Sequence, residues 1–318
     1  KYERAITFYQ KAIDYGLKDP SPKVRLQSVN NLATLKHPKS LERLIKAASE
    51  NPDEKEIIAA CQKSIAIYKE DAFEPIKKSL WTSEKMSDQR IALQLLNKIE
   101  ISKEFLKEVA DKFYGTPYQE DEAIMKFRQE MARFIAEHAK DEIRSLYIPE
   151  IIAMLGDKDK DLAIIIEKVV VKWKDPNAIE YLNQLYYMNS QDSSIIISIL
   201  EILSEYESFS SKKCNKNFKL NDITLFLETF GNNDEKIQKL SYKALKSHGY
   251  NDSEGKILEY LQKFKDCENE TVRSNVVDLI QSFSMMTIPK GAEPPKFQIP
   301  VLSKRPGYCG IPLEQSSL

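Results

Sequence analysis

The sequence predicts an all-α protein, an α–α superhelix of about eight helical hairpins followed by an extended C-terminal segment. Three observations lead to this prediction. Apolar residues recur with the period of amphipathic helices, and polar turns return at near-regular intervals. Glycine, which tight turns between strands favour, is scarce, with 9 among 318 residues.

The helical period is clearest in the second half of the chain. Ile195, Ile199, Ile202 and Tyr206 fall on one face of a helix. Two β-branched runs, residues 162–173 and 194–200, resemble buried strands. They are too continuous for half-exposed strands, and the few glycines leave few turns. We therefore predict buried helices in both runs.

The repeating unit is predicted to be a hairpin of one longer and one shorter helix. The longer helices start at intervals of 33 to 42 residues, near Val24, Ile57, Arg90, Ile124, Leu162, Ile195, Ile237 and Val272. The shorter helices are expected over residues 40–49, 72–80, 103–114, 145–155, 178–188, 220–230 and 254–265. Spacing of this kind is typical of solenoids, in which each unit buries its apolar face against its neighbours.

Proline and glycine divide the chain into two regimes. Residues 1–288 contain six Gly and eight Pro, whereas residues 289–318 contain three Gly and six Pro. Because proline interrupts helices, we predict a helical-repeat domain over 1–288 and an extended Pro/Gly-rich tail over 289–318. The apolar residues of the tail are candidate partner-binding residues: Phe297, Ile299, Val301, Leu302 and Tyr308. The tail could cap the last hairpin, or dock as a linear motif on a partner or a second copy.

Composition excludes several classes of protein. The chain has 47 basic and 48 acidic residues and a net charge of −1, which argues against nucleic-acid binding through bulk positive charge. No run of apolar residues is long enough to span a bilayer. His37, His138 and His248 have no second ligand at metal-binding spacing. No catalytic residue, metal site or cofactor is predicted.

The four cysteines form no CxxC pair. Cys61 and Cys267 are predicted to be small core or turn residues. Cys309, in the tail, is predicted to be the exposed thiol.

Several turn-and-helix segments resemble HEAT repeats, in the short bacterial form first noted in phycobilisome lyases. The segments are DPSPKVRLQSVNNL, ENETVRSNVVDLI and SDQRIALQLL, and the resemblance covers roughly residues 20–285. In that family a turn aspartate and an arginine of the second helix form a ladder between neighbouring repeats. The resemblance therefore implies a structural ladder role for Asp19, Arg25, Arg90 and Arg273. Ile58, Ala163 and Ile196 replace the arginine in other repeats, which implies an interrupted ladder.

The first predicted helix, residues 2–16, resembles the second helix of a tetratricopeptide unit. It could equally be the first helix of the first hairpin. The chain begins at Lys1, so we expect a fragment of a longer protein. A cytoplasmic location is the default expectation, with the periplasm as the alternative.

An array of hairpins offers a long surface and no deep central chamber. We therefore expect a non-enzymatic scaffold or adaptor that binds other proteins through the solenoid surface and the tail. A larger bacterial assembly, such as an envelope or motility machine, is the expected setting. The alternatives are a HEAT-like enzyme of the lyase or DNA glycosylase type, or a eukaryotic trafficking adaptor. A glycosylase needs a basic groove for DNA, which the near-zero net charge disfavours.

Overall fold

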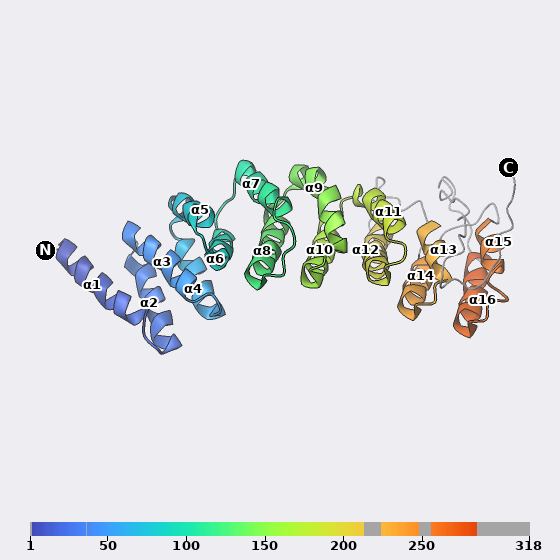
Figure 1. Cartoon of the computed structure of the whole chain (residues 1–318), viewed down its shortest axis with the longest axis horizontal. Helices are drawn as coiled ribbons and strands as arrows, with labels where there is room; N and C mark the ends of the chain where they lie inside the picture. The colour runs from blue at the N-terminus through green and yellow to red at the C-terminus, as the bar shows by residue number, and fades with distance from the viewer. Residues whose placement is uncertain (1, 36, 213–223, 248–255, 285–318) are drawn as a thin grey trace. The chain divides into compact units, whose positions relative to one another are not determined.

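The computed structural model describes residues 2–35, 37–212, 224–247 and 256–284. Over these residues the chain forms sixteen α-helices and two short 3-10 helices, with no strand element (Figure 1). The predicted all-α, helical-repeat fold is confirmed. The predicted tail, residues 289–318, lies outside the described residues.

The chain divides into two compact units. The first comprises residues 1–150 and 157–169, and the second comprises residues 151–156 and 170–318. The helices α9 (Asp141–Ala153) and α10 (Lys160–Trp173) are therefore each divided between the units. The single repeat domain predicted over 1–288 stays a prediction.

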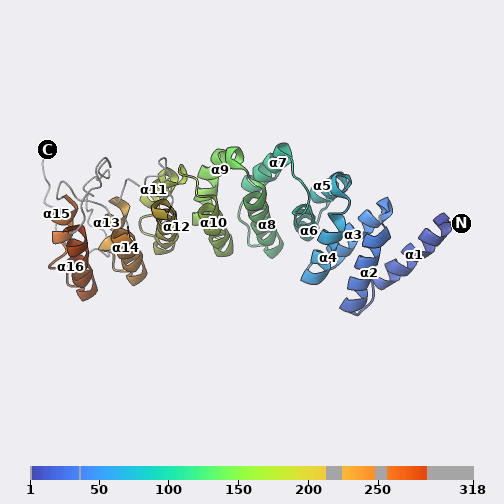
Figure 2. The ribbon, with the colours of Figure 1, turned by 180° about the vertical axis from the view of Figure 1, so that it is seen from behind.

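The first unit contains four complete helical hairpins. Their helices are α1 (Tyr2–Gly16), α2 (Pro22–Leu35), α3 (Pro38–Glu50), α4 (Lys55–Ile65), α5 (Phe73–Thr82), α6 (Met86–Leu96), α7 (Lys103–Tyr114) and α8 (Glu122–His138), with a 3-10 turn at Lys69–Ala72 before α5. The helices of each hairpin pack together, and α2, α4, α6 and α8 form a row in which each contacts the next. Figure 2 shows the same pairing from behind.

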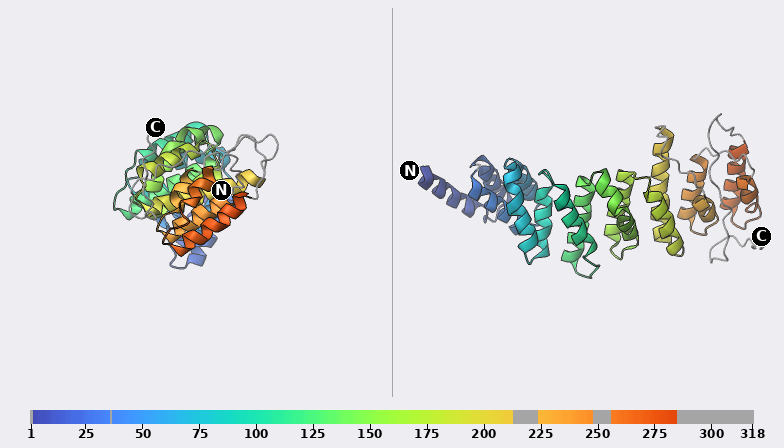
Figure 3. Two further views of the ribbon diagram at one scale, coloured as in Figure 1. Left: turned by 90° about the vertical axis from the view of Figure 1, so that its right-hand side faces the viewer. Right: turned by 90° about the horizontal axis from the view of Figure 1, so that it is seen from above.

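The second unit contains three complete hairpins. Their helices are α11 (Ala178–Met188), α12 (Ser193–Lys212), α13 (Thr224–Phe230), α14 (Glu235–Ser247), α15 (Lys256–Gln262) and α16 (Glu270–Ser284), with a 3-10 turn at Met154–Gly156. Here α12 contacts α14, and α14 contacts α16. The pairing can be followed from above in the right panel of Figure 3.

The turns before the longer helices supply the caps that start them. Five carboxylate or amide side chains each accept a hydrogen bond from the backbone N–H three residues later, at 2.9–3.3 Å. These cap residues are Asp121, Asp159, Asp192, Asp234 and Asn269. Each satisfies a backbone donor that the helix itself leaves unpaired. The caps explain why the polar turns repeat with the helices.

The two β-branched runs are helical, as predicted. The run 162–173 lies in α10 and the run 194–200 lies in α12. Within α12, Ile199 and Ile202 are fully buried, while Ile164 in α10 is 51% exposed. Tertiary burial of a continuous apolar face outweighs the weak strand preference of β-branched residues.

One predicted helix begins earlier than expected. The sequence predicts a start at residue 145, whereas α9 begins at Asp141. The Lys140 carbonyl accepts from the N–H groups of Ile143 and Arg144, at 2.9 and 3.0 Å. The helix therefore begins directly after α8 ends. Pro149 lies inside α9.

At position 231 of the second unit the close approach of the Phe264 ring leaves room only for glycine. A Cβ added at Gly231 would lie 2.4 Å from Cε1 of Phe264, whose ring is buried and packs edge-on against Phe230. We expect Gly231→Ala to lower the free energy of unfolding by about 1–3 kcal/mol, because the ring must move within a packed core. Urea denaturation followed by circular dichroism measures the change.

Gly156→Ala is the matched control for Gly231→Ala. Its added Cβ would meet Cδ1 of Ile195 at 3.5 Å, an ordinary contact. We expect a change within about 1 kcal/mol in either direction. Equal effects of the two substitutions would contradict the steric explanation.

Candidate functional site

Two of the three arginines of the implied ladder, Arg25 and Arg273, hold the turns that precede their own helices. Arg25 donates from Nη1 to the carbonyl oxygens of Asp19 and Pro20, at 2.6 and 3.0 Å. Arg273 donates from Nη1 to the carbonyl oxygens of Cys267 and Glu268, at 2.5 and 2.8 Å. The two arginines therefore make the same contacts in different repeats, bonding to turn carbonyls five and six residues earlier.

Two of the implied ladder residues also reach a neighbouring hairpin. Arg25 forms an ion pair with Glu54, in the turn before α4. Arg90 donates to the carbonyl of Pro52 in that same turn, at 3.2 Å. The turn before α4 is thus held from α2 on one side and from α6 on the other. The Asp19 carboxylate instead accepts from the N–H of Ser21, at 2.8 Å, and shapes its own turn.

Glutamines perform the turn-holding role in two further repeats. Gln89 donates to the carbonyl of Ser83 at 2.7 Å, and Gln238 donates to the carbonyl of Asn232. Neither glutamine was predicted, because the resemblance to HEAT repeats implies arginine in this role. The signal was present, since Gln238 directly follows Ile237 as Arg25 directly follows Val24.

The most buried charged side chain described in the first unit, that of Arg128, was not predicted from the sequence either. Arg128 of α8 pairs with Asp157 through two bonds, Nη1–Oδ1 at 3.2 Å and Nη2–Oδ2 at 2.6 Å. Their side chains are 2% and 9% exposed. Burial raises the pKa of Asp157, but hydrogen bonds from Arg128 and from the Asp159 N–H outweigh it, so the pKa lies below its ordinary value. The carboxylate is therefore charged at neutral pH.

Polar contacts between neighbouring longer helices continue in the second unit. Lys236 of α14 pairs with Glu201 of α12 at 2.8 Å. Lys246 of α14 pairs with Asp278 of α16 at 2.7 Å, and Tyr242 donates to the same carboxylate. Such exposed pairs contribute little stability each, and each of them joins two neighbouring helices.

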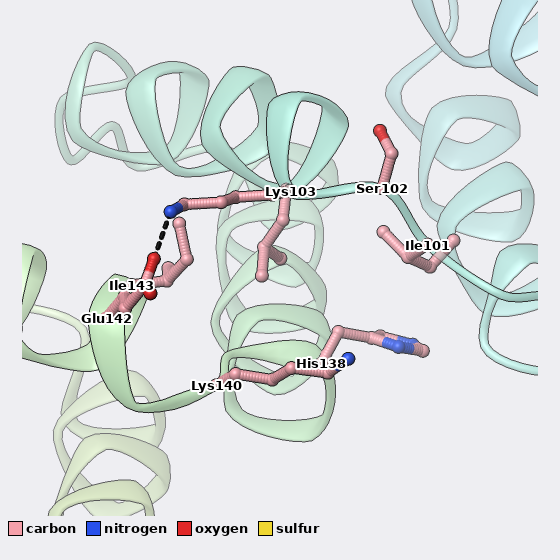
Figure 4. A pocket seen from close by; sticks show the side chains of 8 residues that line it. Ile101, Ser102, Lys103, His138, Lys140, Glu142 and Ile143 are labelled. Atoms are coloured by element: carbon pink, nitrogen blue, oxygen red, sulfur yellow. Dashed lines mark hydrogen bonds and ion pairs between the residues drawn. The ribbon is translucent and has the colours of Figure 1, made fainter.

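The first unit contains a pocket of about 370 Å³, formed by the turn before α7, α7 itself, the end of α8 and the start of α9 (Figure 4). Its apolar lining consists of Ile101, Leu106 and Ile143. Its polar lining consists of Ser102, Lys103, His138, Lys140 and Glu142. Lys103 and Glu142 form an ion pair across it, with side chains 59% and 79% exposed.

Aromatic packing supports the wall of this pocket. The His138 ring lies 4.5 Å from that of Phe134, which packs edge-on against Phe105 at 6.2 Å. His138 Nε2 also lies 3.2 Å from Oδ1 of Asn97, at the end of α6. The imidazole is thus fixed from two sides. The sequence gives no sign of this pocket, because its lining comes from two separate segments, residues 101–106 and 138–143.

Two cysteines are placed by the structure. Cys61 is free and fully buried, and burial raises the pKa of its thiol to about 12. Cys267 is buried in the turn before α16, as predicted, but it is disulfide-bonded, which the sequence analysis did not predict. The sulfur to which it is bonded lies outside the described residues, as does Cys309. Disulfides persist mainly in oxidising compartments.

The disulfide predicts a thiol count. In urea without reductant, fewer than the 4 cysteines of the chain should react with a thiol reagent, and all should react after reduction. In Cys267→Ser the unreduced count should rise by one although a cysteine has been removed, because the bonded sulfur is released. Full reactivity of the unreduced wild type would show that the bond does not form. Before urea is added, Cys61 should stay unreactive, because the thiolate is the reactive form.

The remaining predicted site residues cannot be placed. Phe297, Ile299, Val301, Leu302 and Tyr308 lie outside the described residues. Among the residues that are described, no cluster of three or more His, Cys, Asp or Glu side chains could hold a metal ion. Within the same ranges, no helix has both the length and the apolar character that a membrane span requires.

Comparisons with known proteins add little to this picture. No family model and no curated protein matches the chain. Among solved structures, an engineered protein is similar at 15% identity over 86% of this chain and 78% of its own, with a TM-score of 0.40. Human deoxyhypusine hydroxylase in complex with glycerol is similar at 11% identity over 89% and 99%, with a TM-score of 0.31. A designed armadillo repeat protein is similar at 14% identity over 86% and 98%, with a TM-score of 0.22. Likeness at this level carries no argument about function.

Proposed function

We propose that this chain is a non-enzymatic scaffold or adaptor of the HEAT type, which binds other proteins within a larger, bacterial assembly. Its hairpins follow one another within each unit, and the second helices of the hairpins contact in rows. In the first two hairpins the second helix is the shorter one, contrary to the prediction, with 14 residues against 15 and 11 against 13. A row of this kind presents an extended surface to a partner.

One observation carries the proposal: the most buried charged pair and many of the partly exposed ones join neighbouring hairpins. Arg25, Arg90 and Arg128 all bond to turns of the adjoining repeat. Charges used in this way fix the spacing of the helices. They hold a surface in shape, which is what a binding scaffold requires.

Exposed aromatic side chains add candidate contact points. On α1, Phe8 is 70% exposed and Tyr15 is 80% exposed, and their spacing of seven residues places them on one helical face. In the second unit, Met188 at the end of α11 is 82% exposed. Aromatic and methionine side chains are enriched at protein interfaces.

The test uses this chain as bait in an extract of its source cells, followed by reconstitution with each purified candidate. We expect a complex of defined stoichiometry by size exclusion with light scattering. Phe8→Ser with Tyr15→Ser tests the α1 face, and Lys46→Ser, an exposed position on α3, is the control. If no purified candidate forms a complex and the chain stays monomeric, the scaffold proposal is wrong.

The same experiment tests the two alternative functions that the sequence suggests, a HEAT-like enzyme and a trafficking adaptor. A HEAT-like enzyme would release a small-molecule product from the reconstituted mixture, and a trafficking adaptor would capture coat or cargo proteins. No contact in the described residues favours either over the scaffold.

A further inference from the structure

We propose that the pocket beside α7 is a docking site for a short acidic segment of a partner protein, with a carboxylate on Lys103 and Lys140 and an apolar side chain on Leu106 and Ile143. The proposal rests on the scaffold function above and names the chemistry of one partner segment.

The size of the pocket limits what can enter. Its volume of about 370 Å³ is near the lower end of the range for ligand pockets. It has room for a few side chains and none for a folded domain. Leu106 and Ile143 are only 3% and 4% exposed, so they form a floor rather than a protruding patch. The occupant is therefore a short segment with one apolar side chain directed inward.

The charges that line the pocket favour an anion. Two lysines, Lys103 and Lys140, face one carboxylate, Glu142. The Lys103–Glu142 pair is exposed on both sides, and exposed pairs contribute little to stability. A carboxylate of the partner can replace Glu142 on Lys103 at small cost. A cationic segment would instead have to approach two ammonium groups.

The helix ends add to this preference. The first turns of α7 and α9 both line the pocket, through Ser102 and Lys103 at one and Lys140 and Glu142 at the other. Ser102 caps α7 by accepting from the N–H of Phe105, at 3.2 Å. Helix N-termini carry a partial positive charge. The first turns of α7 and α9 also carry Glu104 and Glu142, whose carboxylates offset part of this effect, so the lysines remain the main attraction for an anion.

The pocket is also fixed before any partner arrives. His138 is held by Asn97 and by the Phe134 ring. Leu106 is the next residue after Phe105, whose ring packs against Phe134, so the helix that carries Leu106 is held in place. A wall that does not need to be ordered on binding retains more of the interaction energy.

Charge decides against two other occupants. The C-terminal tail, residues 289–318, has four basic and two acidic side chains, so it is not complementary to a pocket lined by lysines. A nucleic acid would meet the Glu142 carboxylate beside two lysines, on a chain of net charge −1, far from the dense basic surface that phosphate binding needs.

The test measures fluorescence anisotropy of three labelled pentapeptides, with sequences EDLLE, QNLLQ and KKLLK, on the whole chain. We expect EDLLE to bind at least tenfold more tightly than the other two, and to weaken as salt is raised. Lys103→Glu with Lys140→Glu should reduce EDLLE binding at least tenfold. Both positions are exposed, and circular dichroism checks that the variant is folded. Lys107→Glu, an exposed position of α7 outside the lining, is the matched control and should change binding less than twofold.

The outcomes are separable. Equal binding of the three peptides, no EDLLE binding at millimolar concentration, or an unaffected double variant would each overturn the pocket proposal. If a purified partner binds the double variant as tightly as wild type, the pocket is wrong and the scaffold stands. If no protein partner binds the wild-type chain, the scaffold proposal itself fails.

Discussion

Replacing Arg128 with methionine should lower the free energy of unfolding by about 3–5 kcal/mol. The substitution keeps most of the side-chain volume but leaves Asp157, whose side chain is 9% exposed, without its cationic partner. An unpaired buried carboxylate costs far more than an exposed one. Urea denaturation followed by circular dichroism measures the loss, with hydrogen exchange in α8 as a local readout, since repeat arrays can unfold in parts.

Two further variants test whether the loss of stability in Arg128→Met comes from breaking the buried ion pair. Lys46→Met removes an exposed ion pair with Glu50 and should lower the free energy of unfolding by less than about 1 kcal/mol. Adding Asp157→Leu to Arg128→Met should restore much of the lost stability, because an apolar pair can replace a buried ion pair. A double variant as unstable as the single one would show that the loss is not electrostatic.

The same pair predicts a pH dependence. The pKa of Asp157 is lowered in the folded chain, so its contribution is present above the unfolded value of about 3.9 and is lost as pH falls through the folded value. In Arg128→Met the remaining burial raises that pKa, and protonation then favours the folded state. The stability difference between variant and wild type should therefore shrink from about pH 7 to about pH 3. A constant difference across that range would contradict the role given to Asp157.

Replacing Phe105 with alanine should lower the free energy of unfolding by about 3–5 kcal/mol. Phe105 is 1% exposed, and its ring packs against Phe73 at 5.1 Å and Trp81 at 6.3 Å, as well as against Phe134. The side chain joins α5, α7 and α8, so the cavity would lie between two hairpins. Trp81 fluorescence in urea, measured in a Trp173→Phe background because the chain has 2 tryptophans, reports the change.

Phe8→Ala is the matched control for Phe105→Ala. Phe8 is 70% exposed on α1, and its truncation should change stability by less than about 0.5 kcal/mol. The Phe105 variant should also bind the EDLLE peptide more weakly, because α7 holds the floor of the pocket. Similar stability losses in the two variants would mean that the aromatic cluster does not connect the hairpins.

The helices could be predicted from sequence because their signals are local. The apolar stripe of Ile195, Ile199 and Ile202 identifies a helix without knowledge of its neighbours, and the cap residue Asp192 marks its start. Repetition of such signals predicted the hairpins. The boundary of α9 was missed because it depends on where α8 ends rather than on its own apolar pattern.

The site residues depend on contacts between hairpins, and these are harder to predict. Arg25 could be singled out because it directly follows a polar turn that recurs along the chain. Arg128 has no counterpart at the same position, and its partner Asp157 is one of many acidic residues about one repeat away. The pocket depends on two turns meeting in space, the one before α7 and the one between α8 and α9. No pattern in the sequence of one turn contains that information.

The separation of the paired residues along the chain has a consequence for how this protein can change over generations. Arg25 and Glu54 are 29 residues apart, as are Arg128 and Asp157, and His138 and Asn97 are 41 apart. Each of these bonds ends at the adjoining hairpin. Loss of one whole hairpin would therefore break bonds to both of its neighbours, as at the turn before α4, and would leave the bonds between more distant hairpins intact.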